Sequence, residues 1–242
     1  MRFFTPCFPL ALLSSTAGAH AFCDDILATQ VLCVTEEAEE IKLCAAQHPE
    51  TGAPAFELHV TPQISDGPLT QLAIDTPFDI QSATIADALD GRDVLGRAPT
   101  GSGKTLAFGI PMVVRLKKAK PRRPTGLILS PTRELAEQIR RELEPLAKER
   151  GRSVHAVYGG VGFGAQLQAL RSGVDMLVAC PGRLLDLIDQ GEVKLDEVSI
   201  AVIDEADRMA DMGFLPVVKE ILDKTNKHRQ TVLFSATLGK EV

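Results

Sequence analysis

One segment of this sequence constrains the fold more than any other: the glycine-rich stretch APTGSGKT at residues 98–105. A loop of this kind, ending in Gly-Lys-Thr, follows a strand and opens a helix. The flanking residues agree, because 93–96 has the character of a short strand and 105–116 has the pattern of a helix. The stretch therefore predicts a strand–loop–helix unit of an α/β protein.

The same loop has the chemistry of a phosphate site. Glycine permits backbone conformations that aim N–H groups, together with the helix N-terminus, at phosphate oxygens. Lys104 would neutralise nucleotide phosphates, and the hydroxyl of Thr105 would bind Mg²⁺. Ala98 holds the first position and Pro99 offers no N–H, so the cradle is assigned to the residues after them. These nucleotide-binding residues are Thr100, Gly101, Ser102, Gly103, Lys104 and Thr105.

A pair of acids follows the apolar run 199–203, which indicates a buried strand. Asp204 and Glu205 come directly after it, at the strand end where open parallel sheets bind ligands. We expect Asp204 to hold Mg²⁺ through water and Glu205 to orient the attacking water as a base. Asp207 is counted with the nucleotide site, although its expected role is to couple the site to neighbouring loops. The alternative is a pair of exposed strand-end acids.

Further strand-length apolar runs alternate with helical patterns. A helix over 133–150 places Leu135, Ile139, Leu143 and Leu146 on one face, and Gly151 ends it. Strands separated by helices form right-handed βαβ units, which predicts an α/β fold with a central parallel sheet and helices on both faces. The remaining predicted strands are 126–130, 154–158, 175–179 and 231–234.

The net charge of −6 is concentrated at the N-terminus. Residues 1–55 contain two basic and seven acidic side chains, which leaves 24 basic and 25 acidic ones in the other 187 residues. A general attraction of those 187 residues to polyanions is excluded, so a nucleic-acid surface would have to be a local stripe. With no Trp and Tyr158 as the single Tyr, base stacking is not expected to be the main binding mode.

The first 55 residues differ from the rest of the chain. Residues 1–21 combine a basic residue, an apolar run and a small-residue end, as a secretory signal does. A disordered or amphipathic leader is the alternative, because Pro6 and Pro9 interrupt the run. The run is too short and broken for a membrane-spanning helix, so no membrane partner is expected.

Residues 22–55 form an acidic segment of unassigned fold, which ends in a breaker-rich linker at 48–54. Three cysteines fall within it and would suit one disulfide in a small exported domain. Beyond it only Cys180 remains, which suits a reducing cytoplasm and conflicts with a secretory signal. The third region, residues 56–242, is the α/β domain.

Four further motifs occur in order: PTRELA at 131–136, PGR at 181–183, DEAD at 204–207 and SAT at 235–237. Together with the glycine-rich loop, they make residues 56–242 resemble the first RecA-like domain of a DEAD-box RNA helicase. The resemblance implies a RecA-like three-layer sandwich. It also implies binding of ATP with Mg²⁺, and ATP hydrolysis coupled to RNA unwinding in the complete protein.

The resemblance assigns roles around the nucleotide. Gln81 would pair with the adenine edge and Phe56 would pack on the base, which favours ATP over GTP. The hydroxyls of Ser235 and Thr237 would bond to the DEAD motif and couple hydrolysis to unwinding. These two residues are therefore grouped as catalytic with Lys104, Asp204 and Glu205.

The resemblance also implies contacts with the sugars and phosphates of RNA, which position a strand without reading its sequence. Cys180 stands where the family usually has threonine, and a thiol is a poorer donor to phosphate. The implied RNA-binding residues are Thr132, Arg133, Gly159, Gly160, Gly182 and Arg183.

Members of this family continue beyond the position of Val242 into a second RecA-like domain, which supplies arginine fingers and completes the RNA clamp. An arginine finger is worth about 10³ to 10⁵ in rate. We therefore expect this chain alone to bind ATP and Mg²⁺ but not to unwind RNA until such a domain is added in cis or trans. Two alternatives remain open: a non-catalytic nucleotide- or RNA-binding module, and a non-functional helicase fragment fused to a small exported protein.

Overall fold

The computed structural model describes residues 32–33, 41–47, 54–60 and 77–237. The chain divides into two units, Met1–Phe78 and Asp79–Val242. The first unit contains an antiparallel sheet of β1 (Leu32–Cys33), β2 (Ile41–Gln47) and β3 (Pro54–Val60). β2 and β3 lie on either side of the predicted linker and pair with each other. The signal-like leader, residues 1–21, lies outside the described residues.

The second unit is built on a sheet of six parallel strands in the order β4-β9-β8-β5-β7-β6. Each strand is short, and three of the inner strands are wholly apolar and buried, as expected for strands that are covered on both faces. The predicted central parallel sheet is confirmed, with strand ends within one residue of those expected. The strands are β4 (Val94–Arg97), β5 (Gly126–Leu129), β6 (Val154–Val157), β7 (Met176–Ala179), β8 (Ile200–Ile203) and β9 (Gln230–Ser235).

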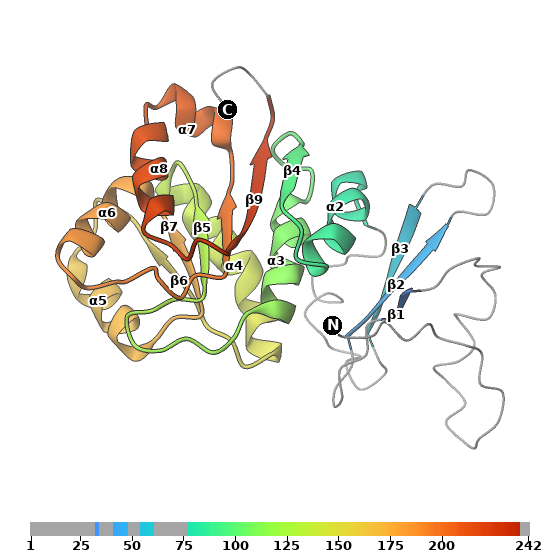
Figure 1. Ribbon diagram of the computed structural model, residues 1–242, viewed down its shortest axis with the longest axis horizontal. Helices are drawn as coiled ribbons and strands as arrows, with labels where there is room; N and C mark the ends of the chain where they lie inside the picture. Colours follow the sequence, from blue (N-terminus) through green and yellow to red (C-terminus); the bar gives the residue numbers. More distant parts are fainter. Residues whose placement is uncertain (1–31, 34–40, 48–53, 61–76, 238–242) are drawn as a thin grey trace. The chain divides into compact units, whose positions relative to one another are not determined.

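Helices connect these strands and lie on both sides of the sheet, which makes the three-layer arrangement (Figure 1). Helices α5, α6 and α8 stand together, whereas α3 and α4 form a separate group. The helices are α2 (Asp79–Leu89), α3 (Lys104–Arg115), α4 (Arg133–Glu149), α5 (Phe163–Ser172), α6 (Pro181–Asp189), α7 (Ala206–Asp211) and α8 (Leu215–Asp223).

The two faces of the sheet can be read from β5, because successive side chains of a strand point to opposite faces. Leu127 and Leu129 belong to a buried cluster that includes leucines, valines and isoleucines of α5, α6 and α8. Gly126 faces the other way, since a side chain there would meet Met112 and Leu116 at the end of α3. Both faces are therefore packed with apolar side chains.

Helix α4 confirms most of the predicted apolar stripe. Ile139, Leu143 and Leu146 are buried, together with two alanines. Leu135 is only half-buried, because it lies in the first turn at the end of the stripe. Gly151 follows the helix with φ of 60°, a left-handed conformation that glycine adopts without strain.

A buried acid, Asp175, ties three segments together just before β7. Its side chain is about 1% exposed. Oδ1 accepts a hydrogen bond from Ala119 N at 2.6 Å, and Oδ2 accepts from Ser153 N at 2.8 Å, Ser153 Oγ at 3.0 Å and Lys118 Nζ at 3.0 Å. Burial raises the pKa of this carboxyl, but the hydrogen bonds outweigh burial and hold the pKa below its usual value. Asp175 thereby fixes the segment after α3 and the entry to β6.

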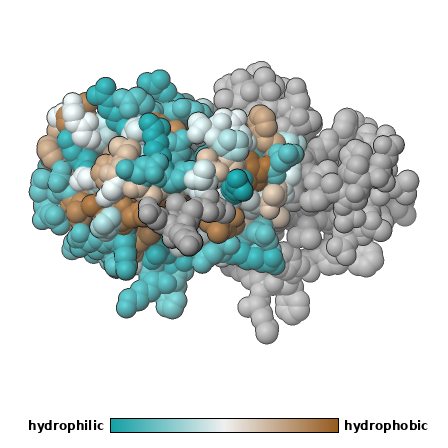
Figure 2. All heavy atoms as spheres, turned by 90° about the horizontal axis from the view of Figure 1, so that it is seen from above, coloured by the Kyte–Doolittle hydropathy of each residue, from teal (hydrophilic) through white to brown (hydrophobic). Residues whose placement is uncertain are grey.

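Hydrophilic residues cover most of the described surface in Figure 2, and hydrophobic residues form smaller areas among them. The large exposed apolar side chains lie in separate parts of the chain: Phe78, Leu95, Val161 and Met212. Within the described ranges, every helix is too short or too polar to cross a membrane.

Candidate functional site

The predicted site residues of the second unit gather at the carboxyl edge of the parallel sheet. The glycine-rich loop follows β4, Thr132 follows β5, Gly159 follows β6 and Gly182 lies after β7. The acid pair follows β8, and Ser235 ends β9. Parallel strands end at the same edge, which is where open α/β sheets bind ligands. Six loops that are far apart in sequence therefore form one surface.

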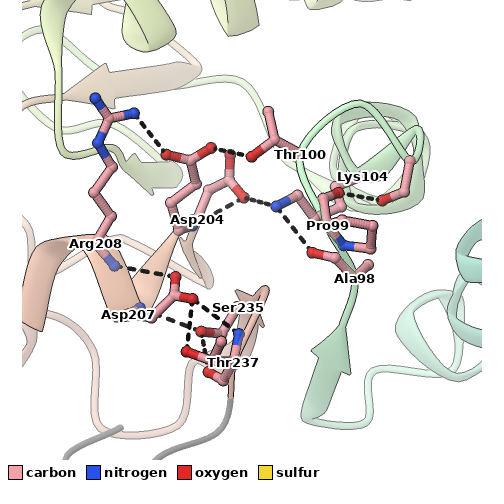
Figure 3. A network of polar contacts seen from close by, with 11 residues as sticks. Ala98, Pro99, Thr100, Lys104, Asp204, Asp207, Arg208, Ser235 and Thr237 are labelled. Carbon is pink, nitrogen blue, oxygen red and sulfur yellow. Dashed lines mark hydrogen bonds and ion pairs between the residues drawn. The ribbon is translucent and has the colours of Figure 1, made fainter.

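The glycine-rich loop has the backbone that its sequence predicts. Gly101 and Gly103 have φ of 83° and 81°, in the left-handed region that favours glycine. Lys104 begins α3, and its side chain is only 6% exposed. Its Nζ donates to the Ala98 carbonyl oxygen at 3.3 Å and lies 3.7 Å from Asp204 Oδ1 (Figure 3). The lysine charge is thus held inside the loop and paired with the acid.

Gln81 braces this loop from α2. Its side chain is buried, and Nε2 donates to the Gly103 carbonyl oxygen at 2.9 Å. The reading of adenine by Gln81 stays a prediction. Phe56 lies on β3 of the first unit, and its side chain is outside the described part of the structure.

The acids after β8 are buried, so the alternative of two exposed strand-end acids is wrong. Asp204 is 3% exposed and Glu205 is 6% exposed. Burial raises the pKa of Asp204 to about 6, against the opposing attraction of Lys104. Glu205 Oε1 accepts a hydrogen bond from Thr100 Oγ1 at 2.7 Å, and Oε2 lies 3.1 Å from Arg208 Nη1. The acid pair and the glycine-rich loop are thus joined directly.

The charges and oxygen atoms at Asp204 suit Mg²⁺. A phosphate in the loop would compete for Lys104 and leave a buried carboxylate without its cation, and a divalent cation would restore that balance. Mg²⁺ prefers oxygen ligands, keeps several waters and needs only one or two protein carboxylates. Among the described residues, no cluster of three or more His, Cys, Asp or Glu side chains forms a metal site. The residues present therefore fit an ion held by Asp204, the Thr105 hydroxyl, phosphate and water.

The third acid of the DEAD motif connects α7 to the end of β9. Asp207 Oδ2 accepts hydrogen bonds from Thr237 N at 2.8 Å and Thr237 Oγ1 at 2.9 Å. The Asp207 N–H donates to Ser235 Oγ at 3.2 Å (Figure 3). Ser235 is fully buried, whereas the bonds of Asp207 to Thr237 are exposed. A shift of Thr237 would therefore be passed through its hydrogen bonds to Asp207, which lies two residues after Glu205.

The residues predicted to contact RNA fall on neighbouring loops at this edge. Thr132 caps α4, because its Oγ1 accepts from Leu135 N at 3.3 Å. The Arg133 side chain is 61% exposed and pairs with the adjacent Glu134. Gly160 has φ of 82°, and a side chain there would lie 3.6 Å from Arg133 Nη1. The first two motifs predicted to contact RNA are thus brought together.

The third motif differs in its surroundings. Gly182 is exposed, but the Arg183 guanidinium is held by protein atoms: it lies 4.1 Å from the centre of the Phe163 ring and donates to the Val161 carbonyl oxygen. Burial raises the pKa of the Cys180 thiol to about 11.

Sequence reasoning missed several residues that complete this edge. Arg208 could have been found from its i,i+3 spacing to Glu205 on the following helix. Phe163 and Gln166 carry no local signal, because their partner Arg183 lies on a different helix.

Comparisons with known proteins agree with this geometry. Residues 78–242 match the model of the family described as DEAD/DEAH box helicase. An Arabidopsis thaliana protein named DEAD-box ATP-dependent RNA helicase 5 is 51% identical over 176 residues, which cover 69% of this chain and 33% of the relative. ATP-dependent RNA helicase DBP2 of Encephalitozoon cuniculi is 44% identical over 72% of this chain and 36% of its own length. The chain thus spans about a third of the length of these curated relatives.

Solved structures of two similar proteins have the same fold as this chain. A DEAD box protein from Methanococcus jannaschii superposes with a TM-score of 0.67 at 34% identity, over 76% of this chain and 50% of that one. A hypothetical ATP-dependent RNA helicase from Sulfolobus tokodaii superposes with a TM-score of 0.66 at 38% identity, over 72% of this chain and 50% of that one. The fold is therefore RecA-like, and the chain belongs to the DEAD/DEAH box helicase family.

Proposed function

We propose that this chain is the ATP-binding part of an ATP-dependent RNA helicase. It binds ATP with Mg²⁺ between the glycine-rich loop and the DEAD motif, and it binds the RNA backbone along the adjoining loops. The observation that supports this most strongly is the buried pair of Lys104 and Asp204, flanked by the bond of Thr100 to Glu205. In this pair, the positive Lys104 can neutralise a nucleotide phosphate, and the negative Asp204 can bind the cation that accompanies the phosphate.

Each residue has a distinct part in the proposed reaction. Lys104 neutralises phosphate charge, and Thr100 holds the Glu205 carboxylate in one orientation through its 2.7 Å hydrogen bond. Glu205 then orients the attacking water and accepts its proton. Mg²⁺ held at Asp204 and Thr105 would neutralise charge on the transferred phosphoryl group. Asp207, through Ser235 and Thr237, links this site to the loop after β9.

A second RecA-like domain is part of the proposed activity. The support is the family and the share of the relatives that this chain covers, about a third. In our proposal that domain supplies the arginine that stabilises the transferring phosphoryl group, which is worth about 10³ to 10⁵ in rate. RNA binds across both domains by backbone contacts, without reading the sequence.

Nucleotide binding is tested by titrating the whole chain with a fluorescent ATP analogue and Mg²⁺. Lys104→Ala should abolish binding, since it removes the only side-chain cation next to Asp204 in the described structure. Lys219→Ala, an exposed lysine on α8, is the matched control and should bind like the unchanged chain. Equal affinity of the two variants would refute the assignment of the site.

Turnover is tested by ATP hydrolysis with and without RNA. The chain alone should show no RNA-stimulated hydrolysis, and a second RecA-like domain from a close relative, supplied in trans, should restore it. Strong RNA-stimulated hydrolysis by the chain alone would refute the need for that domain. ATP binding without restored hydrolysis would favour a non-catalytic binding module.

We further propose the cytoplasm as the site of action, because ATP is available there. The register of β1 and β2 sets Cys33 opposite Cys44, so counting reactive thiols in the natural host's protein tests this proposal. Free thiols at both positions support a reducing compartment. A disulfide between them would support export.

A further inference from the structure

Arg183 is bound on three sides by its own protein. Its Nη1 donates to the Val161 carbonyl oxygen at 3.3 Å and to Gln166 Oε1 at 3.3 Å, and Nη2 donates to Val161 O at 3.2 Å. The guanidinium also stacks on the Phe163 ring at 4.1 Å from its centre. Phe163 packs against the buried cluster beneath α5 and α6, so the core fixes the position of the ring. The N–H groups and the flat face of the guanidinium are thus engaged by groups of the same protein.

Gln166 extends this contact to the other end of the same loop. It is 5% exposed, and its Nε2 donates to the Tyr158 carbonyl oxygen at 3.2 Å while Oε1 accepts from Arg183. The loop over 158–162 is therefore held at Tyr158 by Gln166 and at Val161 by Arg183. Both anchors bond to carbonyl oxygens, so neither uses the backbone N–H groups of Gly159 and Gly160, the kind of group that a turn can offer to an anion.

Arg133 offers a direct contrast. Its side chain is 61% exposed, and its pair with Glu134 is a surface pair that phosphate can replace. Arg183 has less freedom, because moving it to a phosphate would break its stacking on Phe163 and leave the part-buried Gln166 oxygen without this donor. The two arginines of the predicted RNA surface therefore differ in their partners: the Arg133 guanidinium is exposed, and the Arg183 guanidinium is held by other protein groups.

We propose that Arg183, with Phe163 and Gln166, is a positioning residue that holds the Gly159–Gly160 backbone in place for an RNA phosphate and does not pair with phosphate itself. The inference rests on the proposed function, since it concerns the RNA surface of that function. It changes the expected role of Arg183 from an ionic contact to a support for a neighbouring loop.

Salt dependence separates the two roles, because each ionic contact between protein and single-stranded nucleic acid contributes about 0.7 to the slope of log affinity against log salt. The whole chain is titrated with a fluorescent oligouridylate at several salt concentrations. Arg183→Gln should bind about fivefold more weakly, the effect of about one lost hydrogen bond, with an unchanged slope. Arg133→Gln should reduce the slope by about 0.7. Such a reduction in Arg183→Gln would overturn the inference and leave the proposed function intact.

Arg183→Lys provides a second discrimination. Lysine keeps the charge but lacks the planar fork that serves Val161, Gln166 and the Phe163 face together. A positioning role predicts that Arg183→Lys binds as weakly as Arg183→Gln, whereas a phosphate contact predicts near-normal binding. Arg171→Gln removes one exposed charge at the far end of α5 and controls for general electrostatics.

Amide hydrogen exchange tests the loop without RNA. Exchange over residues 158–162 should be about fivefold faster in Arg183→Lys and in Phe163→Leu, and unchanged in Arg171→Gln. Unchanged exchange in the first two variants would overturn the inference by itself. Failure to bind RNA even with a second RecA-like domain supplied in trans would instead refute the proposed RNA function, and with it any role of the loop in that function.

Discussion

Asp175→Asn is the most demanding test of the fold, because it keeps the shape of a buried side chain and changes only its charge and one acceptor. The two carboxylate oxygens face different donors: Ala119 N on one side, and Ser153 N and Oγ on the other. In either orientation, the amide of asparagine sets its own N–H₂ against a backbone N–H. At least one backbone donor beside this side chain therefore loses its acceptor.

Leaving a donor unsatisfied costs about 1–3 kcal/mol, and the loss of bonds to a charged acceptor adds to this. The ion pair with Lys118 adds little, because the lysine side chain is 64% exposed. We expect the free energy of unfolding to fall by about 3 kcal/mol, and Tm to fall by about 6–12 °C for a unit of this size. Thermal unfolding followed by circular dichroism at pH 7 measures both, with exposed Asp186→Asn as the control.

The pH dependence gives an independent check. The native hydrogen bonds hold the pKa of Asp175 below its usual value, so its contribution is present above about pH 4 and is lost as pH falls through the native pKa. The stability difference between the unchanged chain and Asp175→Asn should therefore shrink in acid. A difference below about 1 kcal/mol at pH 7, or one that stays constant into acid, would refute the reasoning.

Three further outcomes follow from the structure. Because burial raises the pKa of Cys180 to about 11, iodoacetamide should modify it about 100-fold more slowly at pH 8 than a free cysteine, as measured by peptide mass spectrometry. Gly160→Ala should destabilise the chain by about 1 kcal/mol in thermal melts because of its φ of 82°, whereas Gly159→Ala, which has open space and no such φ, should change little. Burial, and to a lesser extent the charge of Arg140, lowers the pKa of His155 in the folded chain. Below about pH 6.5 the unfolded chain therefore binds more protons than the folded chain, and the free energy of unfolding falls as the pH falls. His155→Leu should reduce this fall between about pH 7 and pH 5, as measured by thermal melts.

The layers of the fold could be predicted because their signals are local. The inner strands are short apolar runs, and the glycine-rich loop and the acid pair are each a contiguous motif in the sequence. Because β4 and β8 both pair in parallel with β9, their carboxyl ends lie at the same edge of the sheet, which brings Lys104 to Asp204 across one hundred residues. Periodicity and motif chemistry were therefore enough to predict the central sheet and the meeting of the glycine-rich loop with the acid pair.

The contacts between side chains could not be predicted, because they depend on packing between distant segments. Residue 175 reads as the first position of a strand, and only the structure shows that its carboxylate accepts bonds from Ala119 and Ser153. Arg183 reads as one more surface cation, and its partners Phe163 and Gln166 lie on another helix. The sheet of the first unit also went unpredicted, although residues 56–60 read Phe-Glu-Leu-His-Val, an alternation typical of a strand.

Glu205 has φ of 53° and ψ of 52°, a left-handed conformation that a side chain with a Cβ adopts at a cost of about 1–2 kcal/mol. Glycine at this position would remove that cost, and asparagine would reduce it. Selection for thermal stability alone would therefore tend to replace the acid, if the bonds to Thr100 and Arg208 contribute less than the strain. A stabilised library of this domain, sequenced at position 205, would show directly how much stability the chain gives up to keep a carboxylate beside the glycine-rich loop.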